Sequence, residues 1–304
     1  MADIQQLLQK ASELLNMSKE VPLILNEEKY LLLLKQECPS ELDATFYEPA
    51  LCLILQGRKE VIAGQRHFTF GVGQVLIVSH EMPVVSKIAE ASKFEPYIAL
   101  VLRLDMNIIR DMQHEIAEIP FDDDRARSLE VNDASDHMTD ALFRLVNASQ
   151  DLAESIVLFP QILREVHFRL LQAPCGGMLR NLLRQNSHAS KISKAISHIR
   201  CKYSEPMLFA DVAKSVGMSA SSFYHHFKVI TESTPLQYQK NMRLLEARRL
   251  LISEGESVTL TALKVGYESP NQFSREYVRK FGSTPSSDLK IRNLRIPSDA
   301  AYGS

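Results

Sequence analysis

Hydrophobic residues change their spacing along the chain, and the first pattern is typical of β-structure. Between about Thr45 and Leu104, short apolar runs are separated by turn residues such as Gly57, Gly73 and Pro83. The runs are Leu51–Leu55, Val61–Ala63, Phe68–Phe70, Val75–Val78, Val84–Ile88 and Ile98–Leu104. Short strands at such near-regular spacing predict an antiparallel sandwich or a small barrel.

From Met106 onward the apolar residues recur at helical spacing instead. Helices are predicted over Ala134–Asp151 behind an Asp133 N-cap, from Pro160 to near Pro174, and over Gly177–Gln185. From Lys191 the whole pattern is typical of helices separated by short turns. No apolar stretch approaches the roughly 20 residues that cross a bilayer, and the amino terminus lacks the basic start and apolar block of a secretory signal. We therefore expect no membrane association.

The carboxyl-terminal third contains an internal repeat of about 50 residues. FADVAKSVGMSASSFYHHFKVITESTP begins at Phe209, and TLTALKVGYESPNQFSREYVRKFGSTP begins at Thr259. Each copy has a small residue in a short helix, a turn glycine, a serine N-cap and two aromatic residues four apart in a second helix. These parts predict two helix-turn-helix units. An all-helical core built for another purpose is the alternative, and the duplicated spacing disfavours it.

The second helix of each unit has a polar face at the spacing that presents side chains to base edges in the major groove. The candidate groove-facing residues are Ser221, Tyr224, His225 and Lys228 in the first unit, and Asn271, Ser274 and Arg275 in the second. Between the units, Leu236–Ser253 predicts a helix of roughly 27 Å, which could hold the two about one DNA turn apart. Candidate phosphate contacts are Arg243, Arg248, Arg249, Arg279 and Lys280.

The distribution of charge supports a polyanionic partner for the same region. Residues 1–187 hold 18 Lys+Arg against 27 Asp+Glu, a balance of −9, whereas residues 188–296 hold 17 against 9, a balance of +8. The net charge of the whole chain is only −2. A basic segment joined to an acidic one indicates that the basic segment binds a polyanion, here duplex DNA.

Few residues outside the repeat suggest chemistry. The four cysteines are scattered without a CxxC pair, which favours a reducing, cytoplasmic location and argues against a zinc site. His67 and His80 lie in the β-region without a His-x-His pair, so neither a metal nor another cofactor is expected. Cys52 lies in the apolar run LCLIL, which indicates a buried inert thiol or, alternatively, a thiol that senses electrophiles from inside the barrel. Cys52, His67 and His80 are the candidate effector contacts.

The segment EARRLLISEGESVTLTALKVGYESPNQFSREYVRKFGSTP resembles the signature of the AraC/XylS family of transcription regulators, and the resemblance covers about Lys191 to Leu289. FYEPALCLILQGRKEVIAGQRHFTFGVGQVLIVSHEMPVVSKIAEAS resembles the AraC-type N-terminal domain, a cupin-like effector-binding and dimerisation module, from about Leu23 to near Asn186. The resemblance implies the groove-facing positions given above, with His225 where arginine is common in the family. It also implies RNA polymerase, a small-molecule effector and a second copy of the chain as partners.

We therefore expect an α+β protein of two domains. Residues 1–187 form an effector-binding and dimerisation domain, with a β-barrel over about 23–104 and helices over about 105–187. Residues 188–296 form an all-α DNA-binding domain with two helix-turn-helix units joined by a long helix, and 297–304 form a tail. The expected function is sequence-specific transcription regulation, in which a small-molecule effector modulates promoter binding or activation, without catalysis; activation and repression both stay open. Two alternatives stay open: a cupin-type metal enzyme that carries a DNA-binding module, and a constitutive DNA-binding protein with a purely structural barrel.

Overall fold

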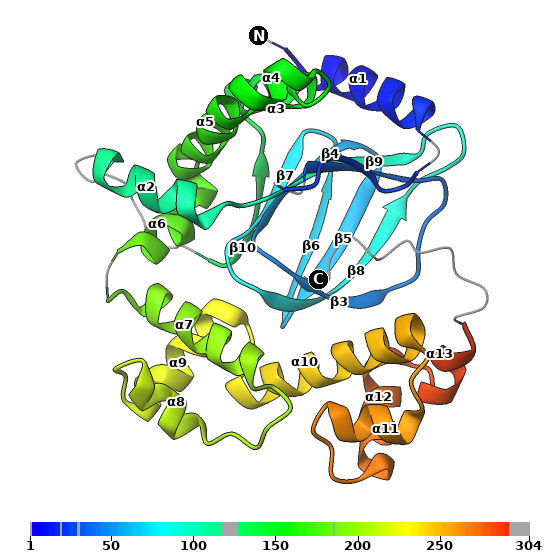
Figure 1. Ribbon diagram of the computed structural model, residues 1–304, viewed down its shortest axis with the longest axis vertical. Coiled ribbons are helices and arrows are strands. Elements are labelled where there is room, and N and C mark those ends of the chain that lie inside the picture. Colours follow the sequence, from blue (N-terminus) through cyan, green and yellow to red (C-terminus); the bar gives the residue numbers. More distant parts are fainter. Residues whose placement is uncertain (1, 19, 29–30, 117–126, 185, 292–304) are drawn as a thin grey trace.

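The computed structural model describes residues 2–18, 20–28, 31–116, 127–184 and 186–291. Figure 1 shows two parts, a β-sheet domain wrapped by helices and a helical domain packed beneath it. The predicted α+β architecture is therefore confirmed. The tail 297–304 and the last residues of the predicted DNA-binding domain lie outside the described residues.

The β-domain consists of two antiparallel sheets. One has six strands in the order β1-β2-β9-β4-β7-β10, and the other has four in the order β3-β8-β5-β6. The strands are β1 (Leu23–Asn26), β2 (Leu31–Gln36), β3 (Asp43–Tyr47), β4 (Ala50–Gln56), β5 (Arg58–Ala63), β6 (Arg66–Gly71), β7 (Gln74–Val78), β8 (Met82–Glu90), β9 (Tyr97–Arg103) and β10 (Leu129–Asp133). Because the sheets face each other without closing, the sandwich of the two predicted forms is observed, and the closed barrel is not.

The six-stranded sheet is buried on both faces, which explains its uninterrupted apolar runs. In β4, Leu51 and Leu53 face the covering helices, whereas Cys52 and Ile54 face the space between the two sheets. The neighbouring strand β9 is divided in the same way, and Leu51 lies opposite Leu102 in the antiparallel register. One core therefore lies between the sheets and a second between the sheet and the helices.

Helices cover the outer face of the six-stranded sheet (Figure 1). They are α1 (Ile4–Met17), α2 (Met106–Ile116), α3 (Asp136–Ala148), α5 (Phe159–Gln172), the 3-10 turn η1 (Pro174–Gly176) and α6 (Gly177–Leu183), whereas α4 (Leu152–Val157) packs against α5. Helix α1 begins with a capping box between Asp3 and Gln6, and it buries Leu7, Ala11 and Leu15. That stripe of small and branched residues fits the sheet surface.

The structure corrects the predicted start of the helical region. Residues 129–133 pair with β7 as β10 instead of continuing the helical pattern. Asp133 is the last residue of that strand, and the helix begins behind Ser135, whose side chain accepts the Met138 N–H. The predicted N-cap Asp133 was therefore wrong, because pairing with β7 overrides the local helix signal.

The carboxyl-terminal domain contains two small hydrophobic cores, and the helix α10 (Pro235–Arg249) contributes residues to both. Its elements are α7 (His188–Cys201), α8 (Phe209–Ser215), α9 (Ala220–Thr231), α10 (Pro235–Arg249), the π-helical turn η2 (Leu250–Glu254), α11 (Val258–Lys264), α12 (Pro270–Phe281) and α13 (Pro285–Ile291). Phe223, Phe227 and Tyr238 fill the first core, and Phe273 and Tyr277 fill the second. The predicted rod Leu236–Ser253 is observed as α10 continued by η2.

Acidic residues of the β-domain face basic residues of the helical domain where the two parts meet. Arg248 near the end of α10 pairs with Asp43 of β3, and Arg200 at the end of α7 pairs with Glu81. The Tyr238 hydroxyl of α10 donates to the Glu81 carbonyl at 2.8 Å, and its ring meets Phe46 edge-on at 5.5 Å. Ion pairs and an aromatic contact thus join the helical domain to the β-sandwich.

Candidate nucleic-acid interface

The first helix-turn-helix unit comprises α8, a glycine turn and α9. Gly217 turns the chain with φ +69°, a left-handed conformation that glycine adopts without strain. The Ser219 side chain then accepts the Ser222 N–H at 3.3 Å and caps α9. Phe223 and Phe227 are fully buried on one side of α9, so the opposite side of the helix is left facing outward.

The second unit repeats this arrangement in α11, its turn and α12. Gly266 has φ +87°, and a Cβ atom there would lie only 2.0 Å from the Ser204 carbonyl oxygen. Ser269 caps α12 by accepting the Gln272 N–H, and Pro270 occupies the first helical position. Tyr277 is fully buried and donates a hydrogen bond to Asp288 of α13 at 2.8 Å.

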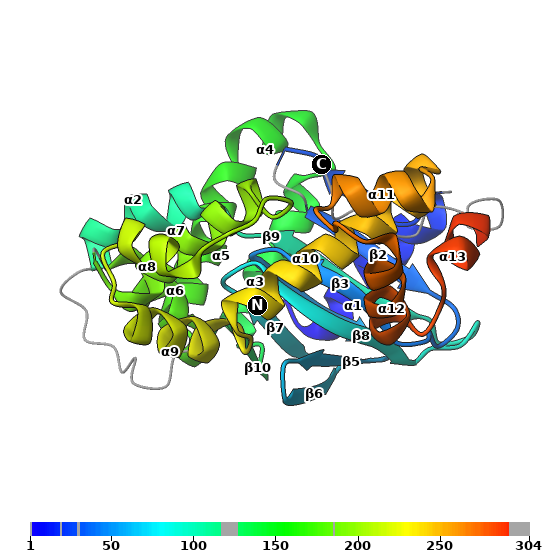
Figure 2. The same cartoon turned by 90° about the horizontal axis from the view of Figure 1, so that it is seen from below.

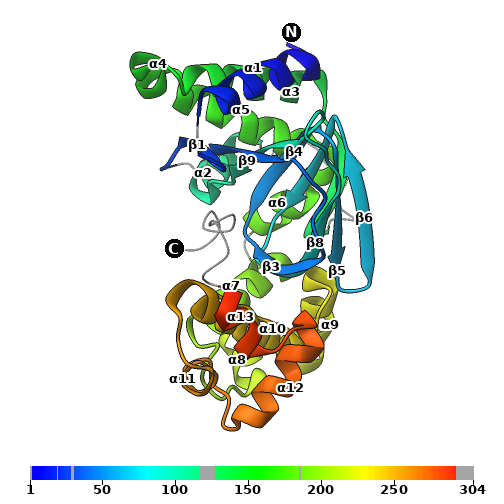
Figure 3. The same ribbon diagram turned by 90° about the vertical axis from the view of Figure 1, so that its right-hand side faces the viewer.

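The second helices of the two units, α9 and α12, which carry the polar faces, lie on the same side of the connecting helix. Helices α9 and α12 lie near opposite ends of α10 in Figure 2, and both lie on the same side of it in Figures 2 and 3. In α9 the ring of His226 stacks on His188 at 3.6 Å, which leaves His225 exposed. The residues exposed on these faces are Ser221, Tyr224, His225, Lys228, Asn271, Arg275 and Arg279, and Ser274 is half-buried.

Unpaired positive charge is concentrated on these two faces. Lys228 on α9 and Arg275 and Arg279 on α12 are exposed, and no carboxylate of the described residues pairs with them. By contrast, Glu276 on the same helix is occupied by Lys240 at 2.9 Å and by the Tyr267 hydroxyl at 2.8 Å. Burial raises the pKa of Glu276, but these hydrogen bonds outweigh it and keep that pKa below its ordinary value. The faces thus offer free cations to an anionic partner.

Arg243 occupies a structural position instead of a DNA-facing one. Its guanidinium donates to the carbonyls of Tyr203 at 2.7 Å, Gly266 at 2.8 Å and Glu205 at 3.0 Å. These carbonyls belong to the loop after α7 and to the turn of the second unit. Arg243 therefore ties the two helix-turn-helix units together, and its predicted role in binding phosphate does not fit this geometry.

Arg248 and Arg249 are also occupied by protein carboxylates. Arg248 lies between Asp43 and Asp288, the latter at 3.3 Å. Arg249 pairs with Glu246 at 2.7 Å and with Glu254 at 3.0 Å, and the Glu246 carboxylate holds its pKa above the ordinary value. Both guanidinium groups would have to leave these partners to reach a phosphate. Of the five predicted phosphate contacts, only Arg279 is exposed without an ion pair among the described residues.

The three candidate effector residues do not converge on one site. Cys52 is buried between the sheets, where desolvation raises the pKa of its thiol and favours the inert protonated form. His67 is exposed on β6 and faces Glu60 at 3.3 Å. His80 is buried at the domain junction with its Nδ1 facing Ser79 and Ser128, and burial lowers its pKa to about 4. These side chains lie in three separate environments.

One feature of the domain junction was not predicted from the sequence. A cleft of about 540 Å³, called here the interdomain cleft, is bounded by β5, β8, the end of α9, α10 and α12. The half-buried Lys280, predicted as a phosphate contact, lines this cleft. Residues from five elements meet there, and the spacing within any single element does not indicate it.

Two further observations concern chemistry outside DNA binding. Among the described residues, no group of three or more His, Cys, Asp and Glu side chains is arranged to hold a metal ion. No helix in the described part of the chain combines the length and apolarity needed to cross a membrane.

Comparison with known proteins gives matches in both domains. The family "AraC-type transcriptional regulator N-terminus" matches residues 29–178, and the family "Helix-turn-helix domain" matches residues 212–290. The transcriptional activator RhaS of Pectobacterium atrosepticum is 27% identical over 141 residues, which are 46% of this chain and 47% of RhaS. The transcriptional regulator CdhR of Pseudomonas aeruginosa is 28% identical over 37% of this chain and 34% of its own. The chain thus spans less than half the length of these relatives.

Solved structures extend the likeness in fold to most of the chain. A single-residue variant of ToxT from Vibrio cholerae, in its apo form, superposes with a TM-score of 0.57 over 87% of this chain and 98% of its own, at 11% identity. Wild-type ToxT bound to an unsaturated fatty acid gives 0.55 over 85% of this chain and 93% of its own, at 12% identity. At such identity the likeness establishes the shared fold alone.

The β-sandwich domain followed by paired helix-turn-helix units is the class of protein that the two family descriptions give, an AraC-type transcriptional regulator N-terminus joined to a helix-turn-helix domain. The chain belongs to the AraC/XylS family.

Proposed function

We propose that this regulator binds promoters sequence-specifically through α9 and α12, and that a small-molecule effector modulates its promoter binding or activation. The two recognition helices would enter successive major grooves on one side of the duplex. Ser221, Tyr224 and His225 would contact one segment, and Asn271, Ser274 and Arg275 the next. Lys228 and Arg279 would contact the flanking phosphates.

The observation that carries this proposal is the matched pair of exposed polar faces. The two helices that carry these faces lie on the same side of α10, and both contain cations without an ion-pair partner among the described residues. A solvated protein surface commonly pairs its charges with neighbours, as Arg249 and Lys240 do here. Lys228 in the first unit and Arg275 and Arg279 in the second supply such cations, at positions that are not equivalent in the repeat, and phosphate and base contacts require free cations of this kind.

The test is the dependence of DNA binding on salt concentration. If Lys228 and Arg279 neutralise two phosphates, the affinity of the full chain for its promoter should fall by about tenfold or more between about 50 and 200 mM salt. Fluorescence anisotropy on labelled promoter DNA measures this slope. Tight binding that does not depend on salt would contradict the proposal.

We also propose that the boundary between the domains lies at residues 187–188, so that 188–296 binds DNA and 1–187 does not.

Control by an effector is supported by the contacts between the domains. Asp43 and Glu81 of the β-domain form ion pairs with Arg248 and Arg200 of the helical domain. A ligand that shifts the sandwich would therefore change the relative placement of the two helix-turn-helix units. ToxT, which shares the fold, binds an unsaturated fatty acid. Titrating promoter binding with and without fractionated cell metabolites tests the idea, and an unchanged affinity with every fraction would favour constitutive binding. A second copy of the chain and RNA polymerase are proposed as further partners.

A further inference from the structure

The interdomain cleft brings the sensing domain and both DNA-binding units together around one space. Its walls come from β5 and β8 of the sandwich, the end of α9, the connecting helix α10 and the recognition helix α12. Its volume of about 540 Å³ lies within the range of roughly 300–1,000 Å³ that is typical of small-molecule sites. A molecule held here would touch every part whose relative placement matters for DNA binding.

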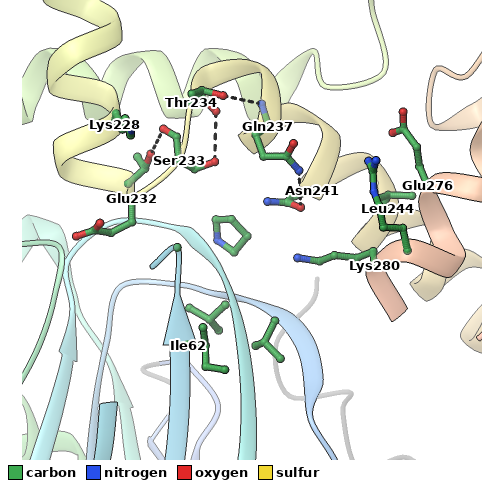
Figure 4. Close-up of a pocket in the computed structure, with 16 residues that line it drawn as sticks. Ile62, Lys228, Glu232, Ser233, Thr234, Gln237, Asn241, Leu244, Glu276 and Lys280 are labelled. Atoms are coloured by element: carbon green, nitrogen blue, oxygen red, sulfur yellow. Dashed lines mark hydrogen bonds between the residues drawn. The ribbon is translucent and has the colours of Figure 1, made fainter. Parts of the chain in front are cut away.

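Lys280 is the most informative residue of this cleft. Its side chain extends from α12 into the space between α10 and the sheet (Figure 4). It is half-buried, and none of the residues that the structure describes forms a hydrogen bond or ion pair with its ammonium. Burial lowers the pKa of Lys280, since an ammonium away from water is stable only beside a counter-charge.

The other charges of the cleft leave a surplus of positive charge. Lys228 and Arg279 line it without an ion pair in the described part of the chain. Of the carboxylates that line it, Glu276 is held by Lys240 at 2.9 Å, and Glu232 faces Arg66 at 3.7 Å. The described residues that line the cleft thus include three cations and two carboxylates, a balance of +1, which suits a ligand with a single negative charge.

The remaining lining is apolar on one side and amide-rich on the other. Ile62 of β5, Val84 of β8 and Leu244 of α10 supply aliphatic surface. Gln237 and Asn241 of α10 lie opposite, and the Gln237 amide donates to Asn241 Oδ1 at 3.3 Å (Figure 4). A cleft with an apolar wall, a few polar groups and the half-buried Lys280 fits an anion attached to an apolar body.

We propose that the interdomain cleft binds a small organic carboxylate, whose anion pairs with Lys280 and whose apolar body lies against Ile62 and Val84. This assignment deepens the proposed function, on which it rests, by giving the effector a site and a chemical class. The bound acid joins β8 to α12, so it couples the sandwich to the second recognition helix.

Calorimetric titration of the full chain with two acids and their neutral counterparts tests the site. Octanoate and 1-naphthoate represent chain-like and ring-like apolar bodies, and octanamide and 1-naphthamide lack the charge. At least one acid should bind the wild-type chain with a Kd below about 1 mM, and its amide should bind at least about tenfold more weakly. Lys280→Met, which keeps the apolar stem, should weaken binding of the acid by about tenfold or more, whereas Lys280→Arg should retain most of it.

Lys194→Met is the matched control, because Lys194 is an exposed lysine on α7 outside the cleft. It should bind the acid as the wild type does. The proposal is overturned if neither acid binds, if acid and amide bind equally, or if Lys280→Met binds the acid as well as the wild type. An acid that binds at Lys280 but leaves promoter affinity unchanged would support the site and contradict effector control instead.

A second measurement does not depend on the acids. Removing a half-buried ammonium that has no partner among the described residues should stabilise the ligand-free chain, so Lys280→Met should unfold at a higher temperature than the wild type. A lower unfolding temperature would show that the ammonium is already satisfied within the protein, which would overturn the assignment.

Discussion

At the scale of single residues, the two turn glycines are equivalent in conformation but not in surroundings. Both have positive φ, yet a Cβ at Gly217 would meet nothing within 4 Å, whereas one at Gly266 would lie 2.0 Å from the Ser204 carbonyl. We predict that Gly217→Ala costs about 1–2 kcal/mol of unfolding free energy, from backbone strain alone. Gly266→Ala should cost about 2–5 kcal/mol, because steric overlap adds to the strain. Urea unfolding followed by circular dichroism measures both, and equal losses would contradict the close approach of Ser204.

His80 should make the chain sensitive to acid. Burial lowers its pKa to about 4, so the folded state keeps it neutral while the unfolded chain takes up a proton below about pH 6.5. Its contribution to stability is therefore present above about pH 6.5 and is lost as the pH falls from there towards about 4. Between about pH 7 and 5 the wild type should lose about 2 kcal/mol more than His80→Gln, as measured by urea unfolding. His67→Gln changes an exposed histidine and serves as the control, so its stability should change with pH as that of the wild type does. If His80→Gln also shows the pH dependence of the wild type, His80 is not the source of the acid sensitivity.

At the scale of elements, α12 should read sequence while α10 supports it. Arg275 is exposed on α12 without an ion pair among the described residues, whereas Arg249 of α10 is held by Glu246 and Glu254. Arg275→Ala should cost about 1–3 kcal/mol at a cognate site and relax preference at one base position. Arg249→Ala should change the affinity for cognate DNA and the affinity for random DNA by the same small factor. Competition binding on the two DNAs separates these cases. If Arg275→Ala loses the same affinity on both, Arg275 does not contact a base.

The elements that could be predicted from the sequence are those whose signals are local. The turn glycines, serine caps and aromatic pairs of both helix-turn-helix units act over a few residues, and the structure contains them where expected. The roles of Arg243 and Arg248 could not be predicted in this way. Asp43, the partner of Arg248, is 205 residues away along the chain, and a single sequence carries no sign of such a pairing. For the same reason the interdomain cleft, which draws on five elements, was not foreseen.

At the scale of the whole molecule, the opposite charges of the two halves serve two purposes. The balance of −9 in residues 1–187 and +8 in residues 188–296 indicated a polyanionic partner for the second half. Part of that complementarity is used inside the protein, where Arg200 pairs with Glu81 and Arg248 with Asp43. The exposed cations left without an ion pair in the described part of α9 and α12 are Lys228, Arg275 and Arg279, and these are the ones proposed to contact DNA. Domain docking and DNA binding therefore draw on the same excess of basic residues.

The central claim is that one chain reads two segments of duplex through α9 and α12. Selection of binding sites from random duplex DNA by the purified full chain tests it most directly. The recovered motif should contain two blocks whose centres lie about 10–10.5 base pairs apart. Arg275→Ala should degrade a position in one block, and Tyr224→Ala should degrade a position in the other. Recovery of no motif or of a single block, or loss of the same position in both variants, would contradict the account.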